Sequence, residues 1–316
     1  MPENSFEYRE LRWADFSSYR SVFVQGMGAF ERATGLDQTT DSFFKFFRRR
    51  SVWTLLALMN ALDRPPLRIY VGVDRGQVVG TAATSMLPNA GYVFGVATDA
   101  AFRGRGIASH LLGMTHLAAQ RKRRPLVALD VESDNETAVR LYRKLGYEDK
   151  GRSDWYVGPL PPTITSPIGS VTEVPRSEIK EVASWLNLNQ LLADRDLMTP
   201  FGRMFTHHET LTQVPGAPPP KTWKLSSSGK TVGLLRGTYL PTIRTGFLFP
   251  ITWEPAASVD SLLSLAIPAI EWVRSLEATR IVVVVPTSSG PWGPAMASLG
   301  LPLAVSTTLM VRPSKP

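Results

Sequence analysis

Two glycines in the first half of the chain stand where a polypeptide can bind phosphate groups through its backbone. Gly104 and Gly106 lie in Val96–Ala108, between a predicted strand and a predicted helix. Glycine lets a ligand approach the backbone closely, and the free amides at the start of a helix attract phosphate oxygens. The alternative is a loop whose glycines only form a turn. The segment has neither the three glycines of the dinucleotide fingerprint nor the Gly-Lys-Ser/Thr ending of a Walker loop.

Two further side chains, Asp130 and Tyr142, are of types that transfer protons. Asp130 lies in the apolar stretch Leu126–Val131, where a carboxylate can act as a general base or hydrogen-bond to the backbone. Tyr142 falls on a predicted short helix, where by itself it is expected to be a core aromatic. The chain has no cysteine, and its histidines are His110, His116, His207 and His208. Thiolate chemistry is therefore excluded, and a histidine-rich metal centre is not expected.

The residues around these side chains predict strands that alternate with helices. The expected strands are Leu67–Val73, Gln77–Ser85, Tyr92–Thr98 and Leu126–Val131. A tight turn at Asp74–Gly76 joins the first two. Apolar residues three and four positions apart predict a helix at Gly106–Gln120. Ser133 and Glu136 have the spacing of a capping box, and the helix that they begin is expected to stop at Gly146.

The second half of the chain repeats this order of elements. The expected strands are Lys221–Leu225, Val232–Tyr239, Gly246–Trp253 and Ile281–Val285, and the expected helices are Val259–Leu276 and Trp292–Leu299. Four prolines between Pro159 and Pro167 predict a linker before this repeat. At roughly 150 residues per domain, the 316 residues then form two domains, 1–160 and 161–316. Both are expected to be of the α/β class, with a mixed sheet.

Two blocks of the first half resemble the GNAT superfamily of acetyl-CoA-dependent N-acetyltransferases. Arg103–Ala108 (RGRGIA) matches the R/Q-x-x-G-x-G/A signature of that family. Asn135–Tyr147 (NETAVRLYRKLGY) is similar to its N-x-x-A-x-x-L-Y-x-x-x-G-F/Y ending. The order and separation of the blocks also match, and the resemblance is specific over residues 67–157. Because the second half repeats the first, the resemblance implies two tandem GNAT-like domains.

The resemblance also implies which residues bind acetyl-CoA. The residues expected to contact the pantetheine arm are Val96, Ala97, Thr98, Asn135 and Ala138. The residues whose backbone amides would bind the pyrophosphate are Arg103, Gly104, Arg105, Gly106, Ile107, Ala108 and Ser109. Tyr142 corresponds to the tyrosine that protonates the leaving thiolate in the family and also lies against the coenzyme. No metal is implied.

The resemblance leaves two candidates for the general base. Many members of the family carry a glutamate at the position of Phe94. Members that resemble the ribosomal-protein N-terminal acetyltransferases carry a glutamate five residues before the asparagine, which here is the position of Asp130. Asp130 or a water molecule is therefore the expected base.

The second half lacks the residues that would bind and activate the coenzyme. Glu254–Ala257, between a predicted strand and a predicted helix, has no glycine and brings a carboxylate to the place of the pyrophosphate. Met296 occupies the position that Tyr142 has in the first half. The second domain is therefore expected to be degenerate, and to support the first domain or shape its acceptor pocket.

The composition is that of an ordinary globular protein, with 43% hydrophobic and 20% charged residues. The net charge of +8 is spread over both halves, so nucleic-acid binding ranks last among the functions considered. The first residues, MPENSFEYRE, have no basic head or apolar core of a signal peptide. No stretch approaches the roughly 18 apolar residues of a membrane span. A cytoplasmic protein without membrane contact is therefore expected.

Together these features predict an acetyl-CoA-dependent N-acetyltransferase in which a primary amine attacks the thioester directly. The acceptor stays open between a small-molecule amine and an amine of a peptide or protein. The alternative is a non-catalytic acyl-CoA sensor or regulatory protein, which would use the same binding residues without turnover. The sequence does not determine the oligomeric state.

Overall fold

The computed structural model of the chain describes residues 6–35, 37, 44–45, 49, 51–54, 67–86, 90–162, 170–178, 217–252, 258–287 and 292–314. Contacts between Cα atoms divide it into two compact units. The first unit contains Met1–Val131, Asn135–Asp149 and Met310–Pro316, and the second contains Glu132–Asp134 and Lys150–Leu309. The end of the chain therefore belongs to the first unit, which the sequence did not indicate. The division of the chain at residue 160 stays a prediction.

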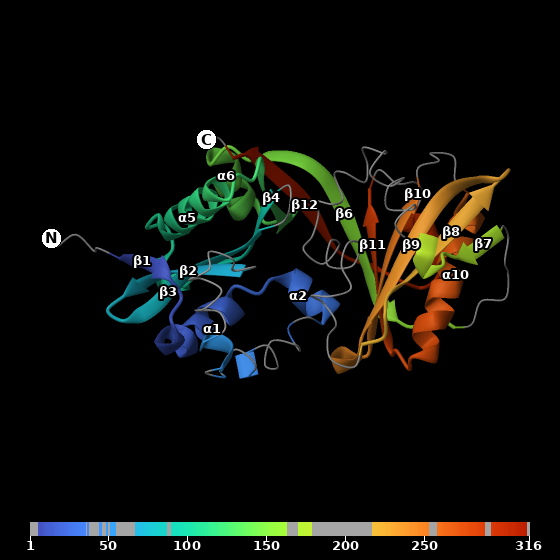
Figure 1. Cartoon of the computed structure of the whole chain (residues 1–316), viewed down its shortest axis with the longest axis horizontal. Helices are drawn as coiled ribbons and strands as arrows, with labels where there is room; N and C mark the ends of the chain where they lie inside the picture. Colours follow the sequence, from blue (N-terminus) through green and yellow to red (C-terminus); the bar gives the residue numbers. More distant parts are fainter. Residues whose placement is uncertain are drawn as a thin grey trace. The chain divides into compact units, whose positions relative to one another are not determined.

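The first unit is built on a mixed sheet, as expected (Figure 1). Its strands, in their order across the sheet, are β1 (Glu7–Glu10), β2 (Leu67–Asp74), β3 (Gln77–Met86), β4 (Ala90–Thr98) and β5 (Leu126–Glu132), followed by the last residues of β12 (Leu303–Pro313). Neighbouring strands from β1 to β4 are antiparallel, whereas β4 and β5 are parallel. The predicted strands of the first half are thus confirmed, with small differences at their ends.

A two-residue turn joins β2 to β3, as the sequence predicted. Asp74 pairs with Gln77, and the two residues between them, Arg75 and Gly76, have φ angles of 47° and 79°. Two consecutive positive φ angles are the geometry of the type I′ turn, whose twist matches that of the flanking strands. The second unit uses the same turn at Ser228 and Gly229, where φ is 48° and 76°. These turns fix the register of both hairpins.

The helices of the first unit are α1 (Phe16–Gln25), α2 (Ala29–Thr34), α5 (Ile107–Arg121) and α6 (Glu136–Lys144), with short 3-10 helices η1 (Trp13–Asp15) and η3 (Ala100–Phe102). Successive residues of β3 point to opposite faces. Val78 belongs to the hydrophobic cluster that contains Tyr19 of α1, whereas Val79 belongs to the cluster that contains Leu111 of α5. Helices α1 and α5 therefore lie on opposite faces, as Figure 1 also shows.

The start of α6 differs from the prediction. Ser133 was expected to cap this helix, but the capping residue is Asn135, whose Oδ1 accepts a hydrogen bond of 3.1 Å from the Ala138 amide. The Ser133 amide instead donates to the carbonyl of Ser306, at 2.8 Å. The prediction was wrong because a strand 173 residues away, counted between Ser133 and Ser306, takes the backbone of Ser133 out of the helix. The helix ends as expected, since Gly146 has a φ of 84°.

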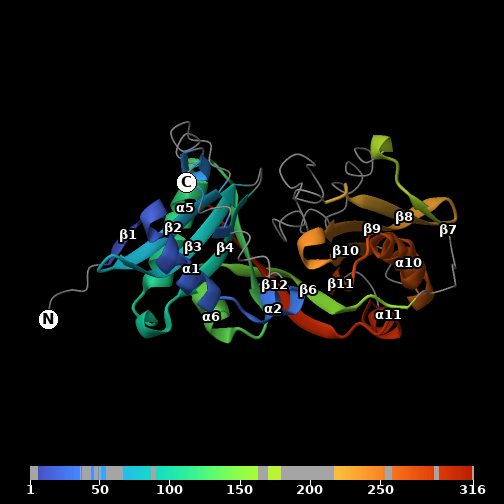
Figure 2. The ribbon, with the colours of Figure 1, turned by 90° about the horizontal axis from the view of Figure 1, so that it is seen from below.

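The second unit repeats the strand and helix order of the first, as predicted (Figure 2). Its strands follow the order β6 (Glu148–Pro159), β11 (Arg280–Pro286), β10 (Thr245–Thr252), β9 (Lys230–Leu240), β8 (Lys221–Ser227) and β7 (Ser170–Glu173), and β12 contributes its first residues beside β6. Its helices are α10 (Val259–Ser275) and α11 (Trp292–Ser298), with η4 (Arg176–Glu178) and η5 (Pro241–Ile243). Of the proline-rich segment, residues 163–169 lie outside the described residues. No helix in the described part of the chain is long and apolar enough to cross a membrane.

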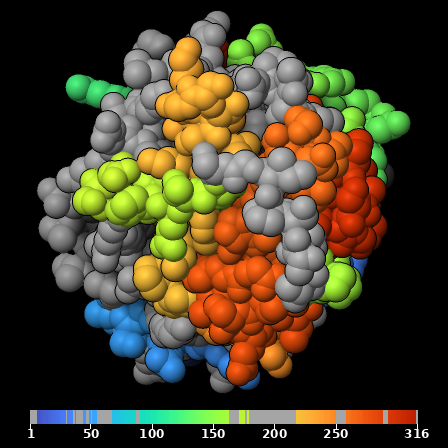
Figure 3. Space-filling model, turned by 90° about the vertical axis from the view of Figure 1, so that its right-hand side faces the viewer, coloured from blue at the N-terminus to red at the C-terminus, as the bar shows by residue number. Residues whose placement is uncertain are grey.

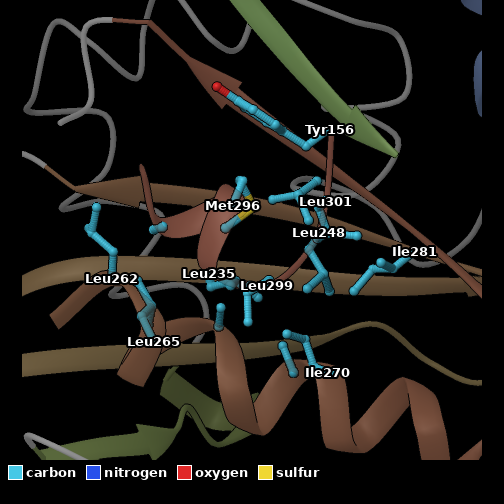
Figure 4. Close-up of a cluster of buried hydrophobic side chains, with 14 of the residues drawn as sticks. Tyr156, Leu235, Leu248, Leu262, Leu265, Ile270, Ile281, Met296, Leu299 and Leu301 are labelled. Atoms are coloured by element: carbon cyan, nitrogen blue, oxygen red, sulfur yellow. The ribbon is translucent and has the colours of Figure 1, made fainter. Parts of the chain in front are cut away.

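The core of the second unit lies between its sheet and α10. Leu262, Leu265 and Ile270 of α10 are buried against Leu235 and Leu248 of the strands (Figure 4). The opposite side of α10 (orange) is at the surface in Figure 3, next to the edge of the sheet formed by β7. Met296 of α11 is fully buried in this cluster, where Figure 4 shows its thioether among apolar side chains. The position that corresponds to Tyr142 is thus filled by core packing.

We predict that Met296→Ala lowers the free energy of unfolding by about 2–5 kcal/mol, because it leaves a cavity among buried side chains. Urea unfolding measures this change. Leu303→Ala is the control, since that side chain is 53% exposed and its truncation should cost less than about 0.5 kcal/mol. Equal effects of the two substitutions would contradict the core position of Met296.

Candidate functional site

The first feature of the site is the point at which β4 and β5 stop pairing. Their parallel register runs from Ala90 opposite Leu126 to Val93 opposite Leu129. Beyond these residues β4 continues to Thr98 and remains paired with β3, while its register with β5 has ended. We call this divergence, beyond Val93 and Leu129, the fork. Along the fork, β4 is therefore no longer paired with β5.

A bulge in β4 re-orients the backbone at the fork. The pairing of β3 with β4 shifts register between Thr81 and Ala83, opposite the β4 residues Phe94–Ala97. Gly95 lies in this stretch and has a φ of 60°, which favours glycine. A Cβ atom on Gly95 would approach Cε2 of Phe23, on α1, to 3.0 Å. The bulge therefore requires glycine for two reasons: the positive φ angle, and the lack of space for a Cβ atom beside Phe23 of α1.

The loop between β4 and α5 forms the second feature. The Asp99 carboxylate accepts a hydrogen bond of 2.9 Å from the Ala101 amide and so starts η3. Gly104 and Gly106 follow with φ angles of 75° and 78°, and both are exposed. A Cβ atom on either would meet no heavy atom within 4 Å. These glycines are thus needed for backbone conformation and leave open space in front of the loop.

The backbone amides of this loop point to anion binding. The first helical hydrogen bond of α5 runs from the His110 amide to the Gly106 carbonyl, at 3.1 Å. Among the described residues, no backbone carbonyl accepts from the amides of residues 104–109. The start of a 15-residue helix also carries a partial positive charge. A diphosphate fits these donors in charge and in hydrogen-bonding capacity.

Two arginines flank these amides and are held by the loop itself. Nε of Arg103 donates to the Thr98 carbonyl, and Nη2 of Arg105 donates to the Ala101 carbonyl, both at 3.3 Å. The Arg105 guanidinium also lies over the ring of Phe102, 5.1 Å from its centroid. Both arginines are exposed. They add positive charge beside the open space without closing it.

Tyr142 lies at the fork on the α5 side of the sheet. It is 7% exposed and shares a hydrophobic cluster with Val93 and Leu129, the last paired residues of β4 and β5. The T-shaped contact with Tyr147, 5.8 Å between ring centroids, fixes the ring. Burial raises the pKa of the Tyr142 hydroxyl to about 12. This hydroxyl therefore stays protonated at neutral pH and can donate a proton.

Asp130 lies on the opposite face. Its neighbours Leu129 and Val131 point into the cluster of Tyr142, so the strand alternation directs Asp130 toward the α1 side. Its Oδ2 accepts a hydrogen bond of 2.7 Å from the Tyr92 hydroxyl. Burial raises the pKa of the Asp130 carboxyl to about 8, against the hydrogen bond from Tyr92, which lowers it. The carboxyl is thus mostly protonated at neutral pH.

The other predicted residues line the fork and the loop. Val96 packs against the clusters on the α5 side, and Ala97 packs against the α1 cluster. Asn135 is exposed at the start of α6, where its Oδ1 caps the helix and its Nδ2 remains as a donor. Ala138 packs against the cluster of Tyr142. The predicted residues therefore gather around one end of the first sheet.

Tyr92 is the residue that the sequence analysis missed. It comes two residues before Phe94, whose ring centroid is 6.4 Å from that of Tyr92. The sequence could have indicated it, since Tyr92 and Phe94 are two residues apart on a predicted strand and so share one face of the sheet. Other predicted features lie outside the described residues, namely His207, His208 and Glu254–Ala257.

Comparison with known proteins agrees with this geometry. Residues 34–147 match the model of the acetyltransferase (GNAT) family. This segment of the chain is therefore similar to that family. The chain is 32% identical over 99 residues to the L-amino acid N-acetyltransferase AaaT of Escherichia coli strain K12. That similarity covers 30% of this chain and 61% of the relative, which is less than two thirds of its length.

Solved structures extend the likeness to the whole chain. The GCN5-related N-acetyltransferase from Sphaerobacter thermophilus aligns over 100% of this chain and 98% of its own, with a TM-score of 0.65 and 16% identity. A tandem GNAT protein from the clavulanic acid biosynthesis pathway aligns over 99% of both chains, with a TM-score of 0.57 and 13% identity. The chain therefore has the α/β fold of tandem GNAT proteins, as the sequence predicted.

We predict that Gly106→Val weakens acetyl-CoA binding by roughly tenfold or more, because its side chain enters the space in front of the GNAT loop amides. The positive φ of Gly106 adds a backbone strain of about 1–2 kcal/mol. Gly76→Val is a matched control, since Gly76 has a φ of 79° and the same open surroundings but lies in the β2–β3 turn. Calorimetric titration with equal affinities for the two variants would remove this loop from the site.

Proposed function

We propose that the chain is an acetyl-CoA-dependent N-acetyltransferase whose first unit transfers an acetyl group to a primary amine. The observation that carries the proposal is the fork, with free loop amides at its α5 side and with Tyr142 and Asp130 on opposite faces of the sheet. A thioester placed along β4 would then have a proton donor on one face and a proton acceptor on the other. The experiment that tests it is the release of free thiol from acetyl-CoA in the presence of amines.

The proposed contacts with the coenzyme come partly from the backbone and partly from side chains. The amides of residues 104–109 would bind the pyrophosphate, and the backbone of Val96–Thr98 would pair with the pantetheine arm. The Nδ2 of Asn135 would donate to a carbonyl of that arm while its Oδ1 caps α6. Most of these contacts use the main chain, so they depend on the bulge and on the two loop glycines rather than on side-chain identity.

The transfer needs one proton removed and one supplied. The amine nitrogen attacks the thioester carbonyl carbon, a C–N bond forms, and the C–S bond breaks. Backbone amides near Val96–Thr98 would stabilise the negative charge on the carbonyl oxygen. Asp130 would take the proton from the amine, directly or through a water molecule, and Tyr142 would protonate the departing thiolate.

The opposite faces of the sheet suit these two roles. Loop 104–109 and Tyr142 lie on the α5 side, which would be the side of the coenzyme. Asp130 lies on the α1 side, from which the acceptor would approach. Because the carboxyl has a pKa raised to about 8 by burial, the proposed base is fully ionised only above that pH. The rate should therefore rise with pH through this range.

The acceptor is proposed only as a class, a primary amine on a small molecule, a peptide or a protein. The name of the Escherichia coli relative makes free L-amino acids the first group to test. A non-catalytic acyl-CoA sensor is the alternative, since it would need the same binding loop. The pairing of a protonated tyrosine with a partly buried carboxyl at the fork favours the enzyme, because binding alone requires neither.

We predict that Tyr142→Phe lowers kcat by roughly 10²-fold and leaves acetyl-CoA affinity almost unchanged, because it removes the proton donor and keeps the ring. Thiol release and calorimetry measure the two quantities. Tyr147→Phe is the control, because the Tyr147 hydroxyl hydrogen-bonds with Nε2 of His116 at 2.8 Å and lies outside the proposed proton transfer. A Tyr142→Phe variant with full rate would assign Tyr142 to the core alone.

We further predict that the chain binds one equivalent of acetyl-CoA, in the first unit. The second unit has the buried Met296 where the first has Tyr142, and the sequence of its Glu254–Ala257 segment offers no glycine. Calorimetric titration of the full chain gives the stoichiometry. Binding of two equivalents would show that the second unit retains a working site.

A further inference from the structure

The Tyr92 hydroxyl bridges β4 and β5 at the base of the fork. Tyr92 precedes Val93, the last residue of β4 that pairs with β5, and Asp130 follows Leu129, the last paired residue of β5. The hydroxyl donates to Oδ2 of Asp130 at 2.7 Å. One phenol thus holds the carboxyl of Asp130 where the backbone ladder ends.

Tyr92 is suited to remain a donor throughout the pH range of the reaction. Its side chain is 4% exposed. Burial and the neighbouring Asp130 carboxyl raise the pKa of the Tyr92 hydroxyl well above its ordinary value. The phenol therefore keeps its proton and cannot itself compete as a base. The proton of this hydrogen bond stays on Tyr92 whenever Asp130 is ionised.

We propose that Tyr92 is a positioning residue for Asp130, holding Oδ2 so that Oδ1 receives the proton of the acceptor amine. This inference rests on the proposed function. A hydroxyl that donates to a carboxylate also stabilises its charged form, so Tyr92 favours the state of Asp130 that accepts a proton. Without this donor, the partly buried carboxyl of Asp130 would be protonated over a wider pH range and would not be fixed at the fork.

Within the described residues, the Tyr92 hydroxyl is the one side-chain group that hydrogen-bonds to the Asp130 carboxyl. β3 carries no Asp, Glu, Lys, Arg or His between Gln77 and Met86. On α1, the Arg20 guanidinium lies over the Phe44 ring, 5.8 Å from its centroid. The titratable groups that pack in or beside the buried clusters of the other elements include Tyr19 of α1, Tyr142 of α6, Tyr147, His116 of α5 and Arg312 of β12. Of these, Tyr142 raises the pKa of the Tyr92 hydroxyl through its charge. His116 hydrogen-bonds with Tyr147, and the Arg312 guanidinium lies over the Tyr147 ring.

The first test is the pH profile of kcat/KM for Tyr92→Phe, measured as thiol release from acetyl-CoA with the best amine found. The midpoint of the rising limb should shift upward by about one pH unit, and the rate below it should fall roughly five- to tenfold. Tyr239→Phe, which removes the hydroxyl of a buried tyrosine from β9 of the second unit, should leave the midpoint in place. An equal loss at every pH would mean that Tyr92 only packs, and would overturn the proposal.

The second test uses stability and does not require activity. Because the pKa of Asp130 is raised from 3.8 to about 8 in the folded state, this group lowers stability as the pH rises between these two values, and its cost is constant above them. Loss of the Tyr92 hydroxyl raises this pKa further, so the stability gap between wild type and Tyr92→Phe should widen from pH 5 to pH 9 in urea. In an Asp130→Asn background, the gap should be the same at both pH values.

The two tests separate the inference from the proposed function. A wild-type chain that releases no thiol with any amine would refute the acetyltransferase proposal, whatever the unfolding data show. A gap between wild type and Tyr92→Phe that stays constant with pH, or that still widens in the Asp130→Asn background, would refute the coupling of Tyr92 to Asp130, even in an active enzyme.

Discussion

The end of backbone pairing between β4 and β5 is the constraint on which the site depends. Parallel strands normally satisfy each other's amides and carbonyls along their whole length. Here the register stops at Val93 and Leu129, so the remaining β4 backbone is no longer paired with β5 and its polar groups are left for water or a polar ligand to satisfy. The Gly95 bulge, the exposed loop glycines and the ring of Tyr142 all lie around this stretch of β4. The fork thus places the proposed donor, acceptor and phosphate site together.

In the second unit, the two corresponding strands also stop pairing, although the proposed proton donor and acceptor are absent from the matching positions. β10 and β11 pair in parallel from Thr245 opposite Arg280 to Leu248 opposite Val283, and β10 then continues to Thr252. The strands therefore separate after the same number of pairs as in the first unit. At the positions of Asp130 and Tyr142, however, this unit has Val284 and Met296, and both are buried. Packing alone is enough to maintain the divergence, whereas the ionisable residues occur only in the first unit.

The sequence predicted those parts of the fold that are encoded by local patterns. The turns at Arg75 and Ser228, the long helices and the buried strands follow from positive-φ residues and from hydrophobic periodicity. What it did not predict depends on residues far apart. The pairing of β11 with β6 and the loss of Ser133 from the helix cap are examples, as is the placement of Met310 in the first unit. In the site, the motif located Tyr142 and Asn135, but the contact of Asp130 with Tyr92 required the register of two strands.

The loss of folding stability caused by the Asp130 carboxyl bears on why this residue is present. A carboxyl whose pKa is raised by burial is more easily protonated in the folded chain than in the unfolded chain, so its ionisation at higher pH opposes folding. The corresponding Val284 shows that an apolar side chain fills this position in the same fold without that cost. The hydrogen bond from Tyr92 reduces the penalty but does not remove it, since the pKa remains at about 8. Stability therefore does not explain the carboxyl, and its position at the fork, opposite Tyr142, agrees with a role in proton transfer.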